Sequence, residues 1–383
     1  MQKCYLMAPG PTPVPESVSL RMAHPAMHHR TPQFSEIFAR VEAGLQYLFQ
    51  TKNDVLMLAC SGSGAMEGSV INFLCRGEKA LVVNGGKFGE RWGKIAQAYG
   101  LEVVWINSDW GVPVNPDDIA VALKNDPSIG GVFIQACDTS ATVAHPIREV
   151  GEIVRQYPNV VYVVDGITAV GVADLAMDRD GIDVLVVGSQ KALMLPPGLA
   201  CVGVSEKAWQ KNSRADLPRF YFDFKKERKA LADQTTAYTP AASLIIGLDE
   251  VLEMIRQETL PVLFARHDIL ARATRAGLEA LGLKLLAPQA PALSCTGAFL
   301  PESVDGKKFV KYVRDTMGVT FAGGQDHLTG KIIRINHMGY VDTFDVVISI
   351  SAMEMALDHF GYSFRMGDGV SAAQKILQER YQR

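Results

Sequence analysis

Short apolar runs alternate with amphipathic stretches through the first half of the chain, between about residues 54 and 205. Runs that are apolar on both faces are typical of strands in a mostly parallel sheet that helices cover on each side. We therefore predict an α/β domain whose strands occupy residues 54–59, 79–84, 102–106, 131–136, 160–165, 183–188 and 199–205.

The hydrophobic pattern changes after this region. Residues 240–282 are strongly helical, and Pro261 predicts a break or a new helix start within them, because proline cannot donate a backbone hydrogen bond. We expect a large domain over residues 15–255 and a small α+β domain over 256–383, on which residues 1–14 pack. Two strands and two helices are predicted in the small domain, in the order strand, helix, strand and helix, at 292–300, 307–318, 331–339 and 343–361.

Composition and charge exclude several classes of function. The 383 residues are 48% hydrophobic and 21% charged, which is a globular balance, and a net charge of −3 offers no basic excess for nucleic acid. The six cysteines form no CxxC pair, and no run approaches the roughly 20 apolar residues of a membrane span. The adjacent His28 and His29 lack a carboxylate or cysteine partner and are poor metal ligands. We expect a cytoplasmic protein with no nucleic-acid partner, no membrane and no bound metal.

A glycine-rich turn follows the first predicted strand, at the strand end where open α/β sheets bind ligands. Ser61, Gly62 and Ser63 can lie there at a helix N-terminus, where free backbone N–H groups and the helix dipole favour a phosphate. A dinucleotide site is not indicated, because the third glycine of its motif is displaced and the next strand ends in Asn84 and Gly85 rather than in an acidic residue. By itself the segment is equally compatible with an ordinary strand-to-helix turn.

Three other strand ends carry side chains that suggest chemistry. Phe88 follows the second strand, Asp165 closes the fifth, and Lys191 follows the sixth. Two of them also have a plain structural explanation, since Asp165 can cap the next helix and Lys191 can reach solvent with its amine. Together with the Ser61–Ser63 turn they form the set that pyridoxal phosphate needs: a lysine for the Schiff base, a carboxylate facing the ring nitrogen, an aromatic face and a phosphate cradle. Burial would also favour the neutral lysine amine that imine chemistry requires.

Six segments, which follow one another between residues 9 and 339, carry a resemblance to a known family that extends over about residues 5–360. They are PGPTPVP, SGSGAMEG, NGGKFGERW, VVDGITAVG, GIDVLVVGSQKALMLPPG and GKIIRINHMG. Together they resemble the class V aminotransferases of fold type I, in the alanine–glyoxylate and serine–glyoxylate aminotransferase branch. Cyanobacterial proteins described as the small subunit of a soluble hydrogenase are similar as well and belong to the same family. The resemblance implies the fold type I architecture, with a mostly parallel sheet in a large domain and a smaller α+β C-terminal domain.

The resemblance implies a role for each matching position. Lys191 would be the Schiff-base lysine, and Asp165 would pair with the pyridine nitrogen of the cofactor. Arg334 would hold the substrate carboxylate, for which the planar guanidinium is suited. Phe88 would stack on the ring. The other cofactor-binding positions would be Ser61, Gly62 and Ser63 at the phosphate, Gln190 beside them, Thr139 near the ring oxygen, Ile167 on the second ring face, and Thr235 and Tyr238 from a loop of the second subunit of a homodimer.

The implied reaction is a ping-pong transamination, in which a small amino acid such as alanine or serine gives its amino group to glyoxylate or pyruvate. The segment DTSAT (138–142) and Ser63 depart from the family's residues, which leaves the choice of substrate open.

Cysteine desulfuration or β-lyase chemistry on the same cofactor is an alternative. A desulfurase needs a mobile nucleophilic cysteine, however, and Cys295 lies in an apolar, strand-like run. An accessory subunit of a hydrogenase-type redox complex is another alternative, but it would not need the lysine, the aspartate and the arginine together.

Overall fold

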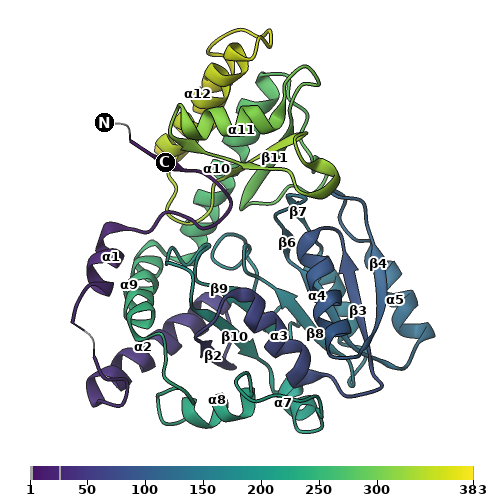
Figure 1. Ribbon diagram of the computed structural model, residues 1–383. Coiled ribbons are helices and arrows are strands. Elements are labelled where there is room, and N and C mark those ends of the chain that lie inside the picture. Colours follow the sequence, from purple (N-terminus) through teal and green to yellow (C-terminus); the bar gives the residue numbers. More distant parts are fainter. Residues whose placement is uncertain (1–2, 26, 383) are drawn as a thin grey trace.

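A computed structural model describes residues 3–25 and 27–382, and a seven-stranded sheet lies at its centre (Figure 1). The strand order is β2-β10-β9-β8-β5-β3-β4, and all pairs are parallel except the two that β10 makes. The strands are β2 (Asp54–Leu58), β3 (Lys79–Asn84), β4 (Glu102–Asn107), β5 (Ile129–Gln135), β8 (Val161–Asp165), β9 (Val184–Gly188) and β10 (Ala200–Val204). The predicted mostly parallel α/β sheet is confirmed.

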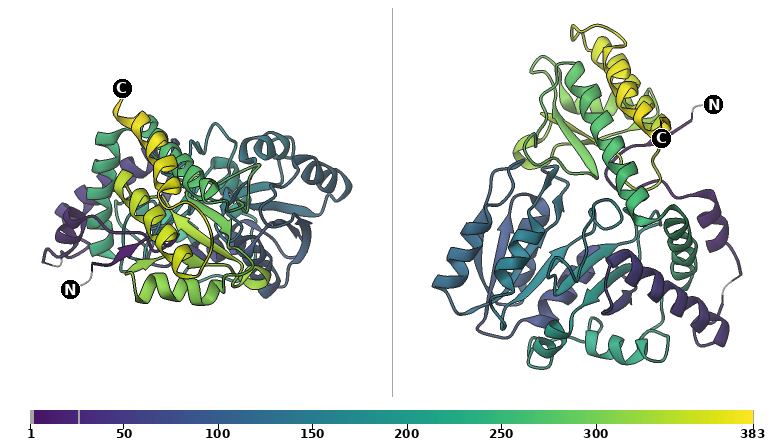
Figure 2. Two further views of the ribbon diagram at one scale, coloured as in Figure 1. Left: turned by 90° about the horizontal axis from the view of Figure 1, so that it is seen from above. Right: turned by 180° about the vertical axis from the view of Figure 1, so that it is seen from behind.

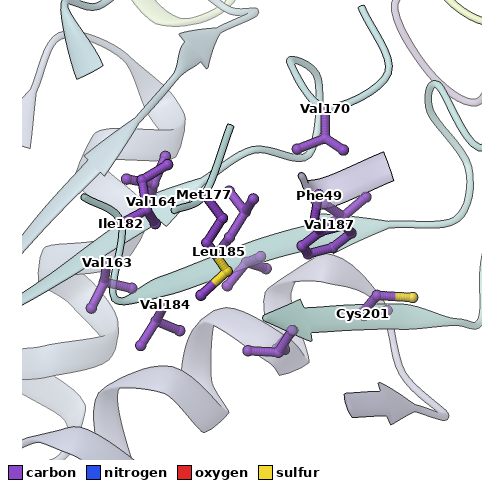
Figure 3. Packing of buried hydrophobic residues seen from close by; sticks show 14 of the residues in the cluster. Phe49, Val163, Val164, Val170, Met177, Ile182, Val184, Leu185, Val187 and Cys201 are labelled. Atoms are coloured by element: carbon purple, nitrogen blue, oxygen red, sulfur yellow. The ribbon is translucent and has the colours of Figure 1, made fainter. Parts of the chain in front are cut away.

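The middle strands of this sheet are buried on both faces. β5, β8, β9 and β10 contain no exposed residue, as strands covered by helices on each side require. Figure 3 shows Phe49 and Met177 packed around β9. A β-carbon on Gly203 of β10 would lie only 2.7 Å from Met177 Sδ, so glycine is needed for this close approach. The helices of this part are α1 (Glu16–Met22), α2 (Pro32–Phe49), α3 (Gly62–Phe73), α4 (Lys87–Ala98), α5 (Pro116–Asn125), α6 (Ile147–Val154), α7 (Glu206–Asn212) and α8 (Phe224–Leu231).

A second hydrophobic core lies in the C-terminal unit, by which we mean β11 to α13 together with the N-terminal strand β1 (Figures 1 and 2). Its antiparallel sheet has the order β11-β14-β13, and β1 pairs with β12 beside it. Helix α13 has no counterpart among the elements predicted from the sequence. The elements are β1 (Tyr5–Leu6), β11 (Cys295–Phe299), α11 (Gly306–Asp315), β12 (Val319–Thr320), β13 (Ala322–Gly323), β14 (Ile332–Asn336), α12 (Thr343–His359) and α13 (Asp368–Leu377).

Two successive helices connect the two cores. α9 (Ala242–Glu258) and α10 (Leu260–Ala280) meet at Thr259, whose φ of 68° interrupts the helix just before Pro261, so the predicted break is confirmed. Leu263 of α10 packs in the core of the large sheet, whereas Ile269 packs in the core of the C-terminal unit. The chain therefore passes from one core to the other within α10. The domain boundary at residue 255 stays a prediction. None of the described helices combines the length and the apolar character that crossing a membrane requires.

Candidate active site

Residues that follow three different strands meet in one buried space. A β-carbon placed on Gly188, the last residue of β9, would lie 3.1 Å from Gln190 Oε1 and 3.7 Å from both Gly62 N and Ile167 Cγ2. Gly62 follows β2 and Ile167 follows β8. The ends of neighbouring strands thus bring together residues that are distant in the sequence, at the edge of the sheet where ligands bind.

Lys191 extends into this space with its amine against the N-terminal segment. Lys191 Nζ donates a hydrogen bond of 2.5 Å to Pro9 O. Burial lowers the pKa of the Lys191 amine, although the Cys295 thiol and the Asp165 carboxyl group oppose the shift. Gly10 passes so close that a β-carbon on it would lie 1.9 Å from Nζ, and its φ of 120° also favours glycine at this position. The lowered pKa favours the neutral, nucleophilic form of the amine.

The N-terminal segment is fixed at both of its ends. Met7 N donates to Thr320 O at 3.0 Å, and Met7 O accepts from Asn336 N at 2.8 Å, which ties the segment to the C-terminal unit. At the other end, Thr12 Oγ1 donates to Lys191 O at 2.7 Å. The segment therefore runs from the C-terminal unit to the lysine. The sequence predicted the first attachment but not the second.

Asp165 is buried at the end of β8. Its Oδ1 accepts a hydrogen bond of 2.9 Å from Ile167 N, so the capping role of a strand-end aspartate is present as well. Burial nevertheless raises the pKa of Asp165 to about 7, against the lowering effects of the Ile167 bond, Arg91 and Lys191. A cation placed against this carboxyl group, such as a protonated ring nitrogen, would return it to its charged form.

Asp138 fixes the start of α4, which carries Phe88. Asp138 Oδ2 accepts from Phe88 N at 3.0 Å and from Gly89 N at 3.3 Å, and Oδ1 accepts from Ser140 N at 3.0 Å and Ser140 Oγ at 2.6 Å. A β-carbon on Gly86 would lie 2.3 Å from the Asp138 carboxyl carbon, so this turn also needs glycine. The sequence marked the segment around Asp138 only as a departure from the family and missed this positioning role.

Arg91 is a second residue that the sequence reasoning missed. Its guanidinium lies 4.9 Å from the centre of the Phe88 ring, and Nη1 donates a hydrogen bond of 2.9 Å to Ser63 Oγ. The residue therefore links the proposed ring-stacking side chain to the start of α3 and places a positive charge there. Its position three residues after Phe88 on a helix was the signal that could have indicated it, because such residues share a helix face.

The N-terminus of α3 offers backbone donors to a ligand. Ser61 is the N-cap residue, and its side chain makes no capping hydrogen bond. The first backbone hydrogen bond of the helix runs from Gly64 N to Ser61 O, at 2.9 Å. The N–H groups of Gly62 and Ser63 come before this bond, so the helix itself does not use them. Gln190 Oε1 is buried without a hydrogen-bond partner among the described residues, which indicates a polar ligand beside it.

Arg334 faces the site from β14. Its Nη1 donates to Thr139 O at 2.7 Å, and its Nε donates to Gly323 O at 3.0 Å. Burial lowers the pKa of Arg334, but an arginine stays charged in proteins. The two bonds hold the guanidinium across the two parts of the molecule and leave Nη2 and one Nη1 hydrogen for a carboxylate. Thr139 takes part here through its carbonyl group, and the cofactor contact of its side chain stays a prediction.

Thr235 and Tyr238 make their contacts on another part of the surface of the same chain. Tyr238 Oη donates to Phe220 O at 2.9 Å, and the Tyr238 ring stacks on Tyr221 with the ring centres 5.1 Å apart. Thr235 N donates to Ala230 O at 3.2 Å. These contacts do not involve Lys191, so a phosphate contact from this loop would need a second subunit and stays a prediction.

The groups that meet here fit pyridoxal phosphate. The buried amine of Lys191, the Asp165 carboxyl group with its raised pKa and the unpartnered Gln190 side chain match the aldehyde, the ring nitrogen and the phosphate of the cofactor. Ile167 lies against the α3 turn, since a β-carbon on Gly62 would be 2.4 Å from Ile167 Cδ1. The turn therefore contacts the segment that directly follows Asp165.

Comparisons with known proteins all point to one family. The model of the family described as aminotransferase class-V matches residues 4–341. A Synechococcus protein named soluble hydrogenase, small subunit, is 42% identical over 98% of each chain, and the L-aspartate–glyoxylate aminotransferase of Paracoccus denitrificans is 33% identical over 98% of this chain and 96% of its own. The crystal structure of ureidoglycine–glyoxylate aminotransferase from Bacillus subtilis matches with a TM-score of 0.94 and 25% identity, over 100% of this chain and 99% of that one. The chain therefore belongs to the class V aminotransferase family, and its cofactor is pyridoxal phosphate.

Proposed function

We propose that this protein moves the amino group of a small amino acid, alanine or serine, to a 2-oxo acid, glyoxylate or pyruvate. The observation that carries the proposal is the position of Arg334, a buried guanidinium that donates a hydrogen bond of 2.7 Å to Thr139 O. Burial lowers the pKa of the Lys191 amine, and the positive charge of Arg334 lowers it further. A carboxylate bound by this arginine would place its α-carbon beside the lysine. The relatives named as glyoxylate aminotransferases support a 2-oxo acid as the acceptor.

Each residue of the site has a defined task in this reaction. When bound, pyridoxal phosphate supplies a carbonyl group that joins to an amine and a ring that draws electrons from the substrate. Arg334 would bind the α-carboxylate and so orient the Cα–H bond of the amino acid. Lys191 Nζ, whose pKa is lowered by burial, would take the proton from Cα, and Asp165 would hold a proton at the ring nitrogen. The same residues would act in the opposite direction on the 2-oxo acid, which gives a ping-pong order.

The assembly that we propose is a homodimer in which each subunit completes the phosphate site of the other. The loop that carries Thr235 and Tyr238 lies beside two exposed aromatic residues, Phe220 and Tyr221, whose burial would stabilise a dimer. Thr235 Oγ1 also lacks a hydrogen-bond partner among the described residues. Light scattering of the purified protein tests this assembly, and a mass of one chain rather than two contradicts it.

The two alternative functions have less support. Cys295, the cysteine that a desulfurase reaction would need, is 1% exposed and lies in β11, where it pairs with Asn336 of β14, so it is not on a mobile loop. The name of the Synechococcus relative suggests a redox complex instead. An accessory role alone would give no reason for Lys191, Asp165 and Arg334 to border one space.

Replacement of Arg334 by alanine tests the substrate site. We expect the KM for the amino acid to rise about a hundredfold, because a charge-assisted bidentate pair is lost, while kcat changes less. Arg334→Lys keeps the charge and should give a smaller rise. Arg314→Ala removes an exposed arginine of α11 and should leave KM unchanged. An unaltered KM in Arg334→Ala would exclude it from carboxylate binding, and no transfer from alanine or serine to either 2-oxo acid would refute the proposed substrates.

Replacement of Asp165 by asparagine tests the desolvation of this carboxyl group. Burial raises the pKa of Asp165 to about 7 in the folded apoprotein, against about 3.9 in the unfolded chain. The unfolded chain therefore loses this proton first, and the free energy of unfolding of the wild type falls as the pH rises between these two values. Asp165→Asn keeps an acceptor for Ile167 N and should stabilise the apoprotein by up to ~4 kcal/mol above pH 7, with a smaller gain at pH 5.

The measurement is thermal unfolding of the cofactor-free proteins between pH 5 and pH 8. Saturation with pyridoxal phosphate is the internal control, because the wild-type Asp165 would then gain a cationic partner and Asp165→Asn would become the less stable protein. An apoprotein of Asp165→Asn that unfolds below the wild type at pH 8 would contradict this explanation.

Replacement of Arg91 by methionine tests whether its charge serves the phosphate. We expect the dissociation constant of pyridoxal phosphate to rise at least about tenfold, because hydrogen bonds to charged groups contribute roughly 1.5–3 kcal/mol. The dissociation constant of pyridoxal, which has no phosphate, should stay the same. Lys94→Met removes an exposed charge of the same helix and is the control. Equal weakening of both ligands in titrations of the apoprotein would mean that Arg91 acts only on the local fold.

A further inference from the structure

Two buried cysteines face each other across the junction between the large sheet and the C-terminal unit. Cys137 is the first residue of β6 (Cys137–Asp138), which follows β5, and Cys295 is the first residue of β11. Figure 1 shows β6 directly beside the C-terminal unit. Both residues are free thiols and are less than a tenth exposed. They therefore belong to different parts of the molecule although their side chains are close.

The contacts around the two sulfur atoms define a small cluster. Cys137 Sγ lies 3.2 Å from Ser294 Oγ, and the same hydroxyl group lies 4.0 Å from Cys295 Sγ. Both side chains therefore contact the same hydroxyl group, and each thiol shifts the pKa of the other.

The charges around the cluster distinguish the two thiols. Cys295 pairs with Asn336 in the β11–β14 ladder, two residues from the Gly297–Arg334 pair, so it shares a sheet face with Arg334. The neighbouring Cys137 thiol lowers the pKa of Cys295, and the positive charges of Arg334 and Lys191 lower it further. The pKa of Cys137 is raised by the neighbouring Cys295 and by burial. Of the two thiols, Cys295 is therefore the one that loses its proton more readily.

The other cysteines do not form such a pair. The pKa values of Cys60 and Cys201 are raised by burial, which makes these thiols unreactive. Cys75 donates a hydrogen bond of 3.4 Å to Arg214 O and lies far from the site in the chain, while Cys4 is exposed. Among the cysteines described, Cys137 and Cys295 alone combine a thiol whose pKa is lowered with a second thiol beside it.

We propose that Cys137 and Cys295 form a reversible disulfide, which links the two parts of the molecule beside the active site when the protein meets hydrogen peroxide. The Cys295 thiolate attacks one peroxide oxygen, an S–O bond forms, the O–O bond breaks, and the departing hydroxide takes up a proton to become water. The Cys137 sulfur then attacks the Cys295 sulfur as its proton leaves; the S–S bond forms, the S–O bond breaks, and the second hydroxide becomes water. Two thiols thus lose two electrons and two protons, and one peroxide becomes two waters.

The position of the bond predicts its effect. Arg334 bonds to Thr139 O, two residues after Cys137, so a disulfide would fix the arginine relative to the loop that it contacts. A transaminase has to admit and release substrates at this place, and a covalent link there would oppose the required movement. The expected loss of activity rests on the proposed function, whereas the formation of the disulfide does not.

The test is peroxide treatment of the holoenzyme followed by peptide mapping without a reductant. We expect a cross-linked peptide that joins Cys137 to Cys295, two hydrogens lighter than the sum of its parts, and a loss of activity that dithiothreitol reverses. Cys75→Ser is the matched control and should still form the link. Cys137→Ser should form no link, and its activity should not return with dithiothreitol, because Cys295 oxidises further without its partner.

The outcomes separate this proposal from the proposed function. Both thiols remaining free while the more accessible Cys75 is oxidised would overturn the disulfide proposal, as would a link from Cys295 to a different cysteine. A link that forms without any change in activity would refute the regulatory effect. Because the link is read by mass, a protein that fails to transaminate alanine or serine can still be tested for it.

Discussion

The site depends on one constraint, which is that an amine and a carboxyl group are held together in a space largely shielded from water. Burial lowers the pKa of Lys191 and raises that of Asp165, so each group loses part of the charge that water would stabilise. Lys191 bonds to Pro9 O and Asp165 bonds to Ile167 N, rather than to each other. The apoprotein therefore carries a free-energy cost, which pyridoxal phosphate would remove under our proposal by giving the amine a covalent partner and the carboxylate a cation.

Elements far from the lysine in sequence keep this arrangement in place. The parallel strands deliver the lysine and the aspartate, but the N-terminal segment covers the amine, and Asp138 fixes the helix that carries Phe88. Arg334 reaches the site from the C-terminal unit by bonding to a carbonyl group of the large-sheet side. The proposed substrate site thus lies between two separately packed cores. A change in their relative position would alter the distance between the carboxylate-binding and proton-transferring groups.

The sequence predicted the parts of the structure that depend on local pattern. Apolar runs located every strand of the large sheet, and the residues after those runs provided Lys191 and Asp165 as candidates for the site. Contacts between remote segments were not accessible in the same way. The bond from Lys191 to Pro9 O, the capping of α4 by Asp138 and the meeting of Cys137 with Cys295 depend on how separate elements pack, which periodicity does not encode. Roles that need a second subunit depend on an assembly that one chain does not contain.

The most direct test of the central claim is borohydride reduction of the holoenzyme, followed by peptide mapping of the attached cofactor. Reduction fixes the cofactor to the lysine that carries it. The account predicts that the label lies on Lys191 alone and that Lys191→Ala takes up none. Label on a different lysine would contradict it. Lys87 serves as the comparison, because it also follows a strand end but is ion-paired with Glu90 and Asp326, so no label is expected on it. Wild-type protein that retains no label after reduction would contradict it equally.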